Sequence, residues 1–162
     1  MAKTVKANEE NIIDIDLSVT RKKKFRIDGD NSRFLELNTS DLGIFARLKE
    51  VYPKMKQLAT SASGILSSVD DESDDTEKTL EALAQLSDID KELRDDLDQI
   101  FDSNVSEVCA PSGTLYDPFN GMLRFEHIIE TLAGLYEDNL QAEFKAMTQR
   151  VQKHTNKYTK KK

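Results

Sequence analysis

The stretch from Met122 to Lys157 constrains the fold more than any other part of the chain, because its apolar residues recur at helical spacing. The apolar positions are Phe125, Ile128, Ile129, Leu132, Leu135, Tyr136, Leu140, Phe144, Met147 and Val151. Steps of three and four place them along one face of a helix, which at roughly thirty residues would be about 45 Å long. Most globular helices are shorter. Part of this face is therefore a candidate surface for a partner, and the alternative is that all of it is core.

Two further helices are predicted before this stretch. The first covers residues 40–66, where Thr39 or Ser40 is expected to cap the start and Pro53 is expected to kink or interrupt the helix. The second covers residues 76–102 and has leucine and isoleucine at helical spacing. Its opposite face is acidic and is expected to be solvated, with a docking face for basic partners as the alternative. The acidic residues of that face are Asp88, Asp95, Asp96, Asp98 and Asp102.

Strand patterns occupy the N-terminal part of the chain. Residues 12–19 alternate apolar and polar side chains from Ile13 onward, which is the pattern of a half-buried strand. The runs 24–27 and 33–37 flank the turn-forming residues 28–32 and predict a β-hairpin. The acidic side chains of this turn have the spacing of a calcium loop, but the glycine and the glutamate that such a loop requires are missing. No metal site is predicted there.

Together these patterns predict one α+β domain over residues 1–162, mainly helical, with three main helices and a small N-terminal antiparallel β-hairpin or sheet. The third helix is expected over residues 121–155, and Asn120 is expected to cap it after a connector rich in turn residues. The expected parts are a loose lead-in at 1–10, a β segment at 11–38, a helical body at 39–157 with an acidic loop at 67–76, and a basic tail at 158–162.

Composition argues against several classes of protein. No apolar run approaches the roughly 20 residues that a membrane helix needs, so no membrane contact is predicted. With Cys109 as its one cysteine the chain cannot form an internal disulfide, and its polar start has no secretory signal, so cytosolic synthesis is expected. The net charge is −7, and residues 70–107 hold fifteen acidic and three basic side chains. Because phosphate contacts need clustered Lys and Arg, nucleic acid is not expected as a ligand.

The chain shows no catalytic motif. Cys109 and His127 are residue types of a nucleophile and a base, but nothing in the surrounding sequence orients them, and a structural or free thiol is the favoured interpretation. Two histidines and one cysteine make a zinc site hard to assemble. There is no phosphate-binding glycine loop and no nucleophile elbow. The chain is interpreted as a non-enzyme with no catalytic residue, cofactor or metal.

Two blocks of sequence carry a family resemblance. One runs from Lys24 to Tyr52, with Phe-Arg-Ile-Asp-Gly-Asp-Asn at 25–31 and Leu-Asn-Thr-Ser-Asp at 37–41. The other has Asn-Val-Ser-Glu-Val-Cys at 104–109, Tyr-Asp-Pro at 116–118, Arg-Phe-Glu-His-Ile-Ile-Glu at 124–130 and Val-Gln-Lys-His-Thr-Asn-Lys-Tyr at 151–158. Together they resemble a small family encoded in the tail-gene clusters of long-tailed bacteriophages and prophages, at the position of the tail assembly chaperones. The blocks cover roughly half of the chain.

The resemblance implies a function in phage tail assembly in the host bacterial cytoplasm. Tail assembly chaperones keep the long, apolar tape-measure protein soluble and bring tail-tube subunits to it, so these two proteins are the expected partners. A long apolar helical face suits helix-in-groove contacts and also leaves a homo-oligomer open. Large aromatic side chains dominate interfaces where they are exposed. The candidate partner-binding residues are therefore Phe45, Tyr52, Phe119, Phe125, Tyr136 and Phe144.

Two alternatives remain beside the chaperone. The strand-rich segment from Ile12 to Leu37 departs from a minimal helical chaperone and would suit strand addition to another protein. It favours a structural component of the virion, in the tail or neck. The acidic middle of the chain favours a phage-encoded inhibitor of a host system, in which the acidic surface would mimic a polyanion.

Overall fold

The computed structural model describes residues 11–17, 22–69 and 75–159. Along these residues the elements are β1 (Lys23–Arg26), β2 (Phe34–Leu37), α1 (Gly43–Val69), α2 (Thr76–Phe101), α3 (Val105–Cys109), β3 (Pro118–Phe119), β4 (Met122–Leu123) and α4 (Arg124–Thr159). The predicted fold class, mainly helical with a small antiparallel β-hairpin, is confirmed. The expected lead-in, residues 70–74 of the expected acidic loop and the end of the basic tail lie outside the described residues, whereas residues 67–69 and Thr76 of that loop are helical.

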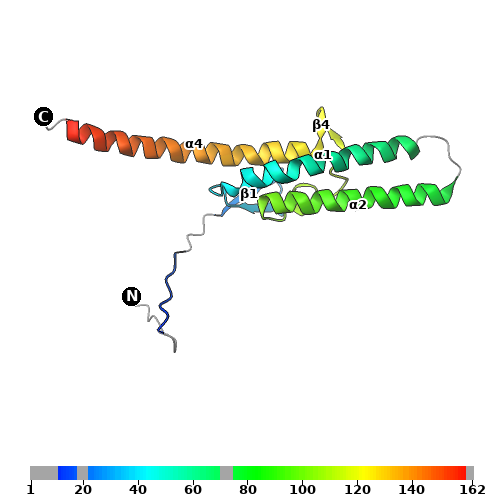
Figure 1. The fold of residues 1–162 in the computed structure, drawn as a ribbon, viewed down its shortest axis with the longest axis horizontal. Coiled ribbons are helices and arrows are strands. Elements are labelled where there is room, and N and C mark those ends of the chain that lie inside the picture. Colours follow the sequence, from blue (N-terminus) through cyan, green and yellow to red (C-terminus); the bar gives the residue numbers. More distant parts are fainter. Residues whose placement is uncertain (1–10, 18–21, 70–74, 160–162) are drawn as a thin grey trace.

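The helices meet in one hydrophobic core. α1 and α2 lie side by side as an antiparallel hairpin, and the first part of α4 packs across the end of this hairpin that carries the β-strands (Figure 1). The ring centroids of Tyr52 on α1 and Phe125 on α4 are 6.3 Å apart. Those of Phe101 on α2 and Tyr136 on α4 are 6.0 Å apart. Aromatic pairs at such distances contribute to packing beyond the area they bury.

α1 continues through Pro53, so the expected interruption is wrong. A proline within a helix removes one backbone hydrogen bond, which here leaves the carbonyl of Lys49 without its donor. Both Pro53 and Lys49 lie on the exposed side of α1. Water can therefore serve that carbonyl, and the buried residues Val51 and Met55 hold the helix in place across the proline.

The start of α1 also differs from the expectation. Asp41, rather than Thr39 or Ser40, supplies the acceptor: its Oδ1 accepts a hydrogen bond of 2.9 Å from the backbone N–H of Gly43. Its other oxygen, Oδ2, lies 2.7 Å from Nη2 of Arg47. The hydroxyl of Thr39 is instead buried, with no hydrogen-bond partner among the described residues.

The predicted hairpin is present, whereas the predicted strand over residues 12–19 is wrong. β1 and β2 pair antiparallel, with Phe25 opposite Leu35. Leu35 is buried in the core. Residues 11–17 form no strand, and Ile15 is 74% exposed. An alternating segment forms a strand only if it pairs with a sheet edge, and residues 11–17 make no such pairing; Val19 lies outside the described residues.

A second, very short hairpin precedes α4. β3 and β4 pair antiparallel around Asn120 and Gly121, whose φ angles are 50° and 80°. Asn-Gly is the preferred pair for a tight hairpin turn, because both positions need positive φ. Asn120 therefore forms this turn instead of capping the long helix, and α4 begins at Arg124 rather than at residue 121.

The molecule is elongated and its helices are staggered. The hairpin tip, defined as residues 60–69 of α1 and 76–83 of α2, extends beyond the start of α4 at one end (Figure 1). At the other end α4 extends beyond the body. We call residues 124–140 the anchored half of α4 and residues 141–159 the projecting half. The projecting half is about 28 Å long at the usual rise of an α-helix.

Candidate protein-binding surface

The anchored half of α4 is part of the core. Its apolar side chains Phe125, Ile128, Ile129, Leu132 and Tyr136 are all buried. Burial raises the pKa of the Tyr136 hydroxyl to about 12. This half of the apolar face is thus used inside the molecule, and it fixes the direction in which the remainder of the helix leaves the body.

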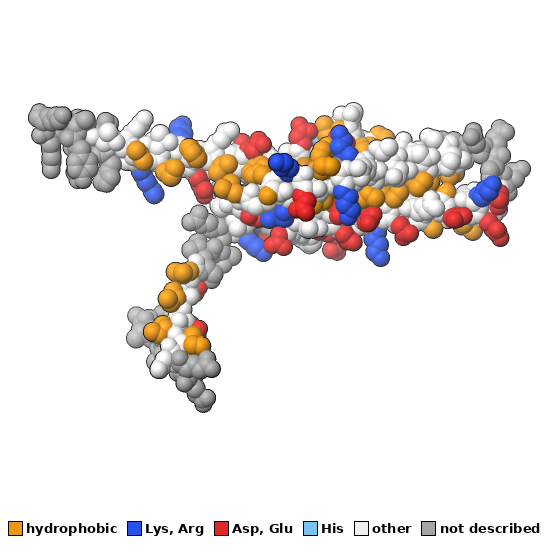
Figure 2. Space-filling view, in the orientation of Figure 1, with side chains coloured by type: hydrophobic (Ala, Val, Ile, Leu, Met, Phe, Trp, Pro, Cys, Tyr) orange, Lys and Arg blue, Asp and Glu red, His pale blue; other side chains and the backbone are white. Residues whose placement is uncertain are grey.

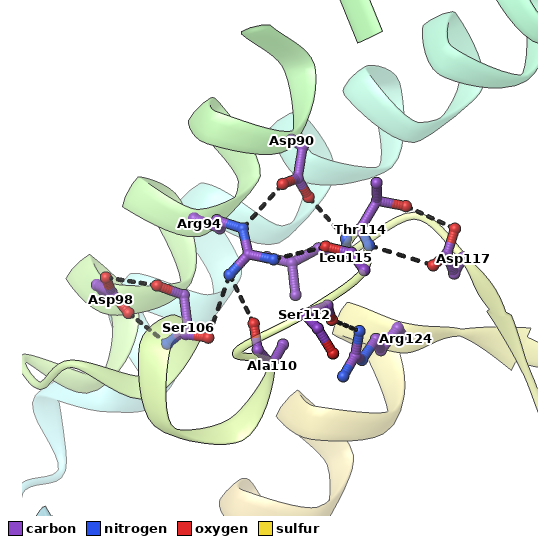
Figure 3. Close-up of polar contacts among 11 residues, drawn as sticks. Asp90, Arg94, Asp98, Ser106, Ala110, Ser112, Thr114, Leu115, Asp117 and Arg124 are labelled. Atoms are coloured by element: carbon purple, nitrogen blue, oxygen red, sulfur yellow. Dashed lines mark hydrogen bonds and ion pairs between the residues drawn. The ribbon is translucent and has the colours of Figure 1, made fainter. Parts of the chain in front are cut away.

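An arginine of α2 holds the connector that leads into α4 (Figure 3). Nε of Arg94 donates to Oδ2 of Asp90 at 2.8 Å, one turn earlier on the same helix. Its Nη1 donates to the carbonyl of Ala110 at 2.8 Å, and its Nη2 to the carbonyl of Gly113 at 2.9 Å. The second oxygen of Asp90 accepts from the backbone N–H of Leu115 at 2.7 Å. Charge-assisted hydrogen bonds of this kind are stronger than neutral ones, so the connector is fixed to α2.

The end of the connector sets the first turn of α4. Oδ1 of Asp117 accepts from the hydroxyl of Thr114 at 2.6 Å, and its Oδ2 accepts from the backbone N–H of Thr114 at 3.1 Å (Figure 3). The backbone N–H of Arg124 donates to the carbonyl of Asp117 at 2.8 Å, and that of Phe125 donates to the carbonyl of Leu115 at 3.0 Å. These contacts fix the polar connector beside the first turn of α4, which contains the buried Phe125.

Part of the acidic face of α2 is structural, which corrects the expectation of a solvated face. Asp98 accepts from both the backbone N–H and the hydroxyl of Ser106, at 2.7 and 2.9 Å, and so holds the start of α3. Asp96 is 5% exposed and lies 3.2 Å from Nζ of Lys54 on α1. Burial raises the pKa of Asp96, although the ammonium group of Lys54 opposes this shift. Asp88 and Asp95 are exposed as expected.

Polar contacts mark the point where α4 leaves the body. Nδ2 of Asn139 donates to the carbonyl of Thr39 at 3.3 Å, and Oδ1 of Asn139 accepts from Nζ of Lys23 on β1 at 3.1 Å. One turn later, the hydroxyl of Ser40 donates to Oε1 of Glu143 at 3.2 Å. The body therefore holds α4 as far as this turn.

The projecting half carries the remainder of the apolar face into solvent. Every side chain from Gln141 to Lys153 is exposed. Phe144 is 63% exposed, Met147 54% and Val151 60%. With Leu140 these residues follow steps of four, three and four, the spacing of a helical seam that packs against another helix. We call Leu140, Phe144, Met147 and Val151 the seam.

Basic residues accompany the seam. Lys145, Arg150, Lys153 and Lys157 belong to the projecting half, and from Lys145 onward that half has no acidic residue. Figure 2 shows orange and blue side chains along it, whereas red side chains follow α2. The surface thus combines exposed apolar area with positive charge.

The six candidate partner-binding residues fall into three groups. Phe125 and Tyr136 are buried and serve the core. Phe45 and Tyr52 are partly buried and pack against it. Among the six, only Phe119 and Phe144 are exposed, at 44% and 63%. The two do not form one site, because Phe119 lies in the β3–β4 hairpin, with its ring 4.6 Å from that of His127, and Phe144 lies on the projecting half.

The choice of aromatic residues as candidates left out the other seam residues, Leu140, Met147 and Val151. A comparison of the lengths of the three helices would have indicated them. α1 and α2 have 27 and 26 residues and α4 has 36, so the two shorter helices cannot cover the whole of α4 even when fully aligned with it. Position along the predicted helix is thus a better guide to exposure than residue type.

The environment of Cys109 does not favour a nucleophile. Burial raises the pKa of its thiol to about 11, so the thiol is protonated at neutral pH. Arg33 donates to the carbonyl of Val108 at 2.6 Å through Nη2 and at 3.0 Å through Nε, which ties this part of the chain to the hairpin. Within the described residues, no three His, Cys, Asp or Glu side chains lie close enough together to hold a metal ion.

No helix in the described part of the chain is both long and apolar enough to cross a membrane. Comparisons of the chain with protein-family models, with curated proteins and with solved structures found no match.

Proposed function

We propose that this protein is a bacteriophage tail assembly chaperone that binds helical segments of the tape-measure and tail-tube proteins, without catalysing a reaction. The observation that carries the proposal is the seam: an apolar stripe on an anchored helix, of which Phe144, Met147 and Val151 are all exposed. Soluble proteins seldom leave a continuous apolar surface uncovered unless it serves an interaction. The resemblance of the two sequence blocks to the phage tail-gene family supports the identity of the partners.

Binding would follow the physics of helix pairing. An amphipathic segment of the tape-measure protein buries its apolar stripe on Phe144, Met147 and Val151, as in other helix-in-groove complexes. Burial of each of these side chains contributes about 1 to 2 kcal/mol. The anchored half already holds α4 in place, so binding fixes few additional side chains of this protein. An assembly protein needs contacts of this modest strength, since its partner must later be released.

The basic side chains along the seam would select partners. Lys145 and Arg150 attract segments whose stripe is flanked by Asp or Glu, and such attraction mainly raises the rate of association. It weakens as salt screens the charges. The expected partner segment is therefore an acidic amphipathic helix.

A pull-down during phage or prophage induction tests the proposal. The tagged full chain is expected to recover tape-measure and tail-tube proteins, and purified particles are expected to lack it. The variant Met147→Asp places a charge in the seam and should lose both partners. Its matched control, Ala146→Asp, places the same charge on the neighbouring, exposed position away from the seam and should keep them. Recovery of host proteins alone would favour the inhibitor.

A structural role in the virion is the second candidate, and the exposed N-terminal arm favours it. Ile13, Ile15 and Leu17 are 67%, 74% and 83% exposed, and they alternate with Asp14 and Asp16. An extended segment of this kind suits strand addition to a sheet edge of another tail protein. Detection of the protein in purified particles at a fixed copy number would favour this candidate and exclude the chaperone.

A further inference from the structure

A groove lies between the β1–β2 hairpin and the anchored half of α4. Its volume is about 450 Å³, and the consecutive residues Phe25, Arg26, Ile27 and Asp28 line one wall. Successive side chains of a strand point to opposite faces of the sheet. A cavity that four consecutive residues line therefore follows the edge of the strand rather than one of its faces. The groove thus runs along the backbone of β1 and of the residues that follow it.

One face of α4 forms the other wall of the groove. Its members recur at helical spacing and are Arg124, His127, Ile128, Thr131, Leu132 and Leu135. From Arg124 to Leu135 the helix rises about 16 Å. About five residues of extended chain cover the same length. The groove therefore has the length of one short strand, and most of this wall is apolar.

The backbone of β1 has hydrogen-bonding groups along this edge. Among the described residues, β1 belongs to a sheet of two strands and pairs with β2 alone. The backbone N–H of Ile27 donates to the carbonyl of Arg33 at 2.9 Å, so Ile27 directs its backbone groups towards the β2 side. In an antiparallel pair such residues alternate with residues whose N–H and C=O point away from the partner. Lys24 and Arg26 therefore direct these groups towards the open edge, which can pair with one further strand.

The charged side chains that line the groove favour an acidic occupant. Arg26 donates through Nη1 to the neutral side chain of Asn31 at 2.8 Å, and Arg124 donates to a backbone carbonyl of the connector. Asp28 also lines the groove, but one of its oxygens lies 3.1 Å from Nη1 of Arg33, so its charge is paired. The groove therefore has a surplus of positive charge, which attracts an acidic segment.

The N-terminal arm, residues 11–17, has the chemistry that fits this groove. Its side chains Ile13, Ile15 and Leu17 are exposed and alternate with Asp14 and Asp16. The arm contains no basic residue. Residues 13–17 are five in number, which matches the length of the groove. Alternating apolar and acidic side chains suit a strand with one face in an apolar groove and the other beside basic residues.

Strand pairing would place the charges of the arm and of β1 opposite one another. Phe25 lies opposite the buried Leu35, so it faces the core side of the hairpin, whereas Lys24 and Arg26 face the other side. An antiparallel register with Ile15 opposite Phe25 directs the apolar side chains of the arm into the groove. The same register sets the two aspartates of the arm opposite Lys24 and Arg26, and cross-strand pairs of opposite charge are stabilising.

We propose that residues 13–17 of a second copy of this chain add to the edge of β1 as a strand and fill the groove with their apolar side chains. In Figure 1 the arm lies away from the body, so it does not occupy the groove of its own chain. Two copies can make the contact twice, each with its arm in the groove of the other, which gives a closed dimer. This association needs no tail protein and does not use the seam.

Sedimentation velocity of the purified full chain over a range of concentrations tests the contact. Wild type is expected to form dimers whose population grows with concentration and falls as salt is raised. Ile15→Asp places a charge on the apolar face of the arm, and Thr131→Tyr fills the groove from its α4 wall. Each variant alone is expected to weaken dimer formation at least about tenfold, because a buried charge or a blocked groove prevents packing.

Matched controls separate these effects from loss of fold. Asn11→Asp adds the same charge to the arm outside residues 13–17, and Thr148→Tyr makes the same change on α4 at an exposed position outside the groove. Both are expected to associate like wild type. Circular dichroism should show equal helix content in all four variants. A wild type that remains monomeric at every concentration would overturn the proposal, and so would a dimer that only Thr148→Tyr weakens.

A proline tests whether the arm pairs with the backbone of β1. Arg26→Pro removes an N–H that points to the open edge, a position at which a strand tolerates proline, whereas Arg26→Gln removes only the charge. The proline variant is expected to weaken dimer formation at least about tenfold more than the glutamine variant. Equal effects of the two would show contact through side chains alone and would overturn strand addition.

A mixing experiment tests whether the arm of one copy enters the groove of another. Ile15→Asp retains an intact groove and Thr131→Tyr retains an intact arm, so an equal mixture can make one of the two contacts. The mixture is expected to form heterodimers that are weaker than the wild-type dimer but stronger than the dimer of either variant. Mixing that restores nothing would overturn the proposal. Because no tail protein is present, failure here leaves the pull-down of tail proteins unaffected, and the reverse also holds.

Discussion

The two halves of α4 have the same kind of apolar stripe but different surroundings. In the anchored half, Phe125 and Leu132 are buried against α1 and α2. In the projecting half, Phe144 and Val151 have no helix of the body beside them and are predominantly exposed. The comparison shows that periodicity defines which face of a helix is apolar. Whether that face is covered depends on how far the neighbouring helices reach.

The largest expected difference between the halves concerns a charge in the stripe. Leu132→Asp places an uncompensated carboxylate in the core and should cost more than about 4 kcal/mol of the free energy of unfolding. The variant is expected to be unfolded, or nearly so, at 25 °C. Urea denaturation followed by circular dichroism measures the effect.

The matched substitution in the other half is Met147→Asp. Its carboxylate remains in water, so a change below about 0.5 kcal/mol is expected under conditions where the protein is monomeric. If both variants lost several kcal/mol, the projecting half would be covered by the body in solution, and the distinction between the halves would fail.

The next largest effect concerns the contacts that place the start of α4. Arg94→Met keeps the apolar stem but removes the donors to Asp90 and to the carbonyls of Ser106, Ala110 and Gly113. A loss of about 3 kcal/mol is expected, because an acidic group and three carbonyls lose charge-assisted partners. Thermal unfolding measures it. Arg150→Met on the projecting half is the control, and equal losses for the two would mean that the connector is not held by Arg94.

A smaller effect is expected inside the body at Asp96, where a substitution should raise the free energy of unfolding. Its carboxylate is buried, and Oδ2 has no hydrogen-bond partner among the described residues. Because burial raises the pKa of Asp96, folding favours the protonated form, and this group makes the protein less stable as pH rises above about 4. Asp96→Asn should therefore stabilise the protein by about 1 kcal/mol at pH 7. Its advantage should shrink below pH 4, as denaturation at both pH values would show.

At Asp41 the pKa shift has the opposite direction to that of Asp96. The hydrogen bond from Arg47 lowers the pKa of Asp41, so this group stabilises the fold above the pKa of the unfolded chain. That stability is lost as pH falls through the lower pKa of the folded state. Asp41→Asn should thus destabilise the protein at pH 7 and become neutral in acid. If Asp41→Asn and Asp96→Asn shifted stability in the same direction at pH 7, the assigned environments would be wrong.

The smallest effect is expected from removal of the projecting half. A chain that ends at Ala142 retains the core and the contacts of Asn139, and loses only the exposed hydrogen bond from Ser40 to Glu143 among the contacts described above. Its free energy of unfolding should change by less than about 0.5 kcal/mol under monomeric conditions, since exposed helix contributes little. The same chain should lose tail-protein binding. A large loss of stability would show that the two halves are not independent.

The sequence predicted those parts of the fold that depend on local chemistry. The turn-forming residues 28–32 identified the β1–β2 hairpin, and apolar spacing identified the three long helices. The strand over residues 12–19 failed because a strand exists only when another strand pairs with it, which a pattern within one segment does not show. Asn120 and Gly121 form a turn that their identity alone would have favoured over a helix cap.

The candidate site was predicted only in part, for a similar reason. Sequence located the seam within the long helix, but exposure of Phe144 and burial of Tyr136 depend on where α1 and α2 end. The contacts of Arg94 join residues of α2 to a connector that follows later in the chain, so no local pattern shows them. A groove beside Ser63, lined by α1, the β3–β4 hairpin and the start of α4, arises from the stagger of whole helices and has no sequence signal of its own.

The projecting half of α4 also has a consequence for hydrogen exchange. Its backbone amides are protected only by the helix itself, whereas those near Leu132 are protected by the core as well. Exchange should therefore become faster along α4 from the exit point at Asn139 towards the last turn. Any occupant of the seam would slow exchange in the segment that it covers. The exchange rates along α4 would thus show which turns a bound partner covers.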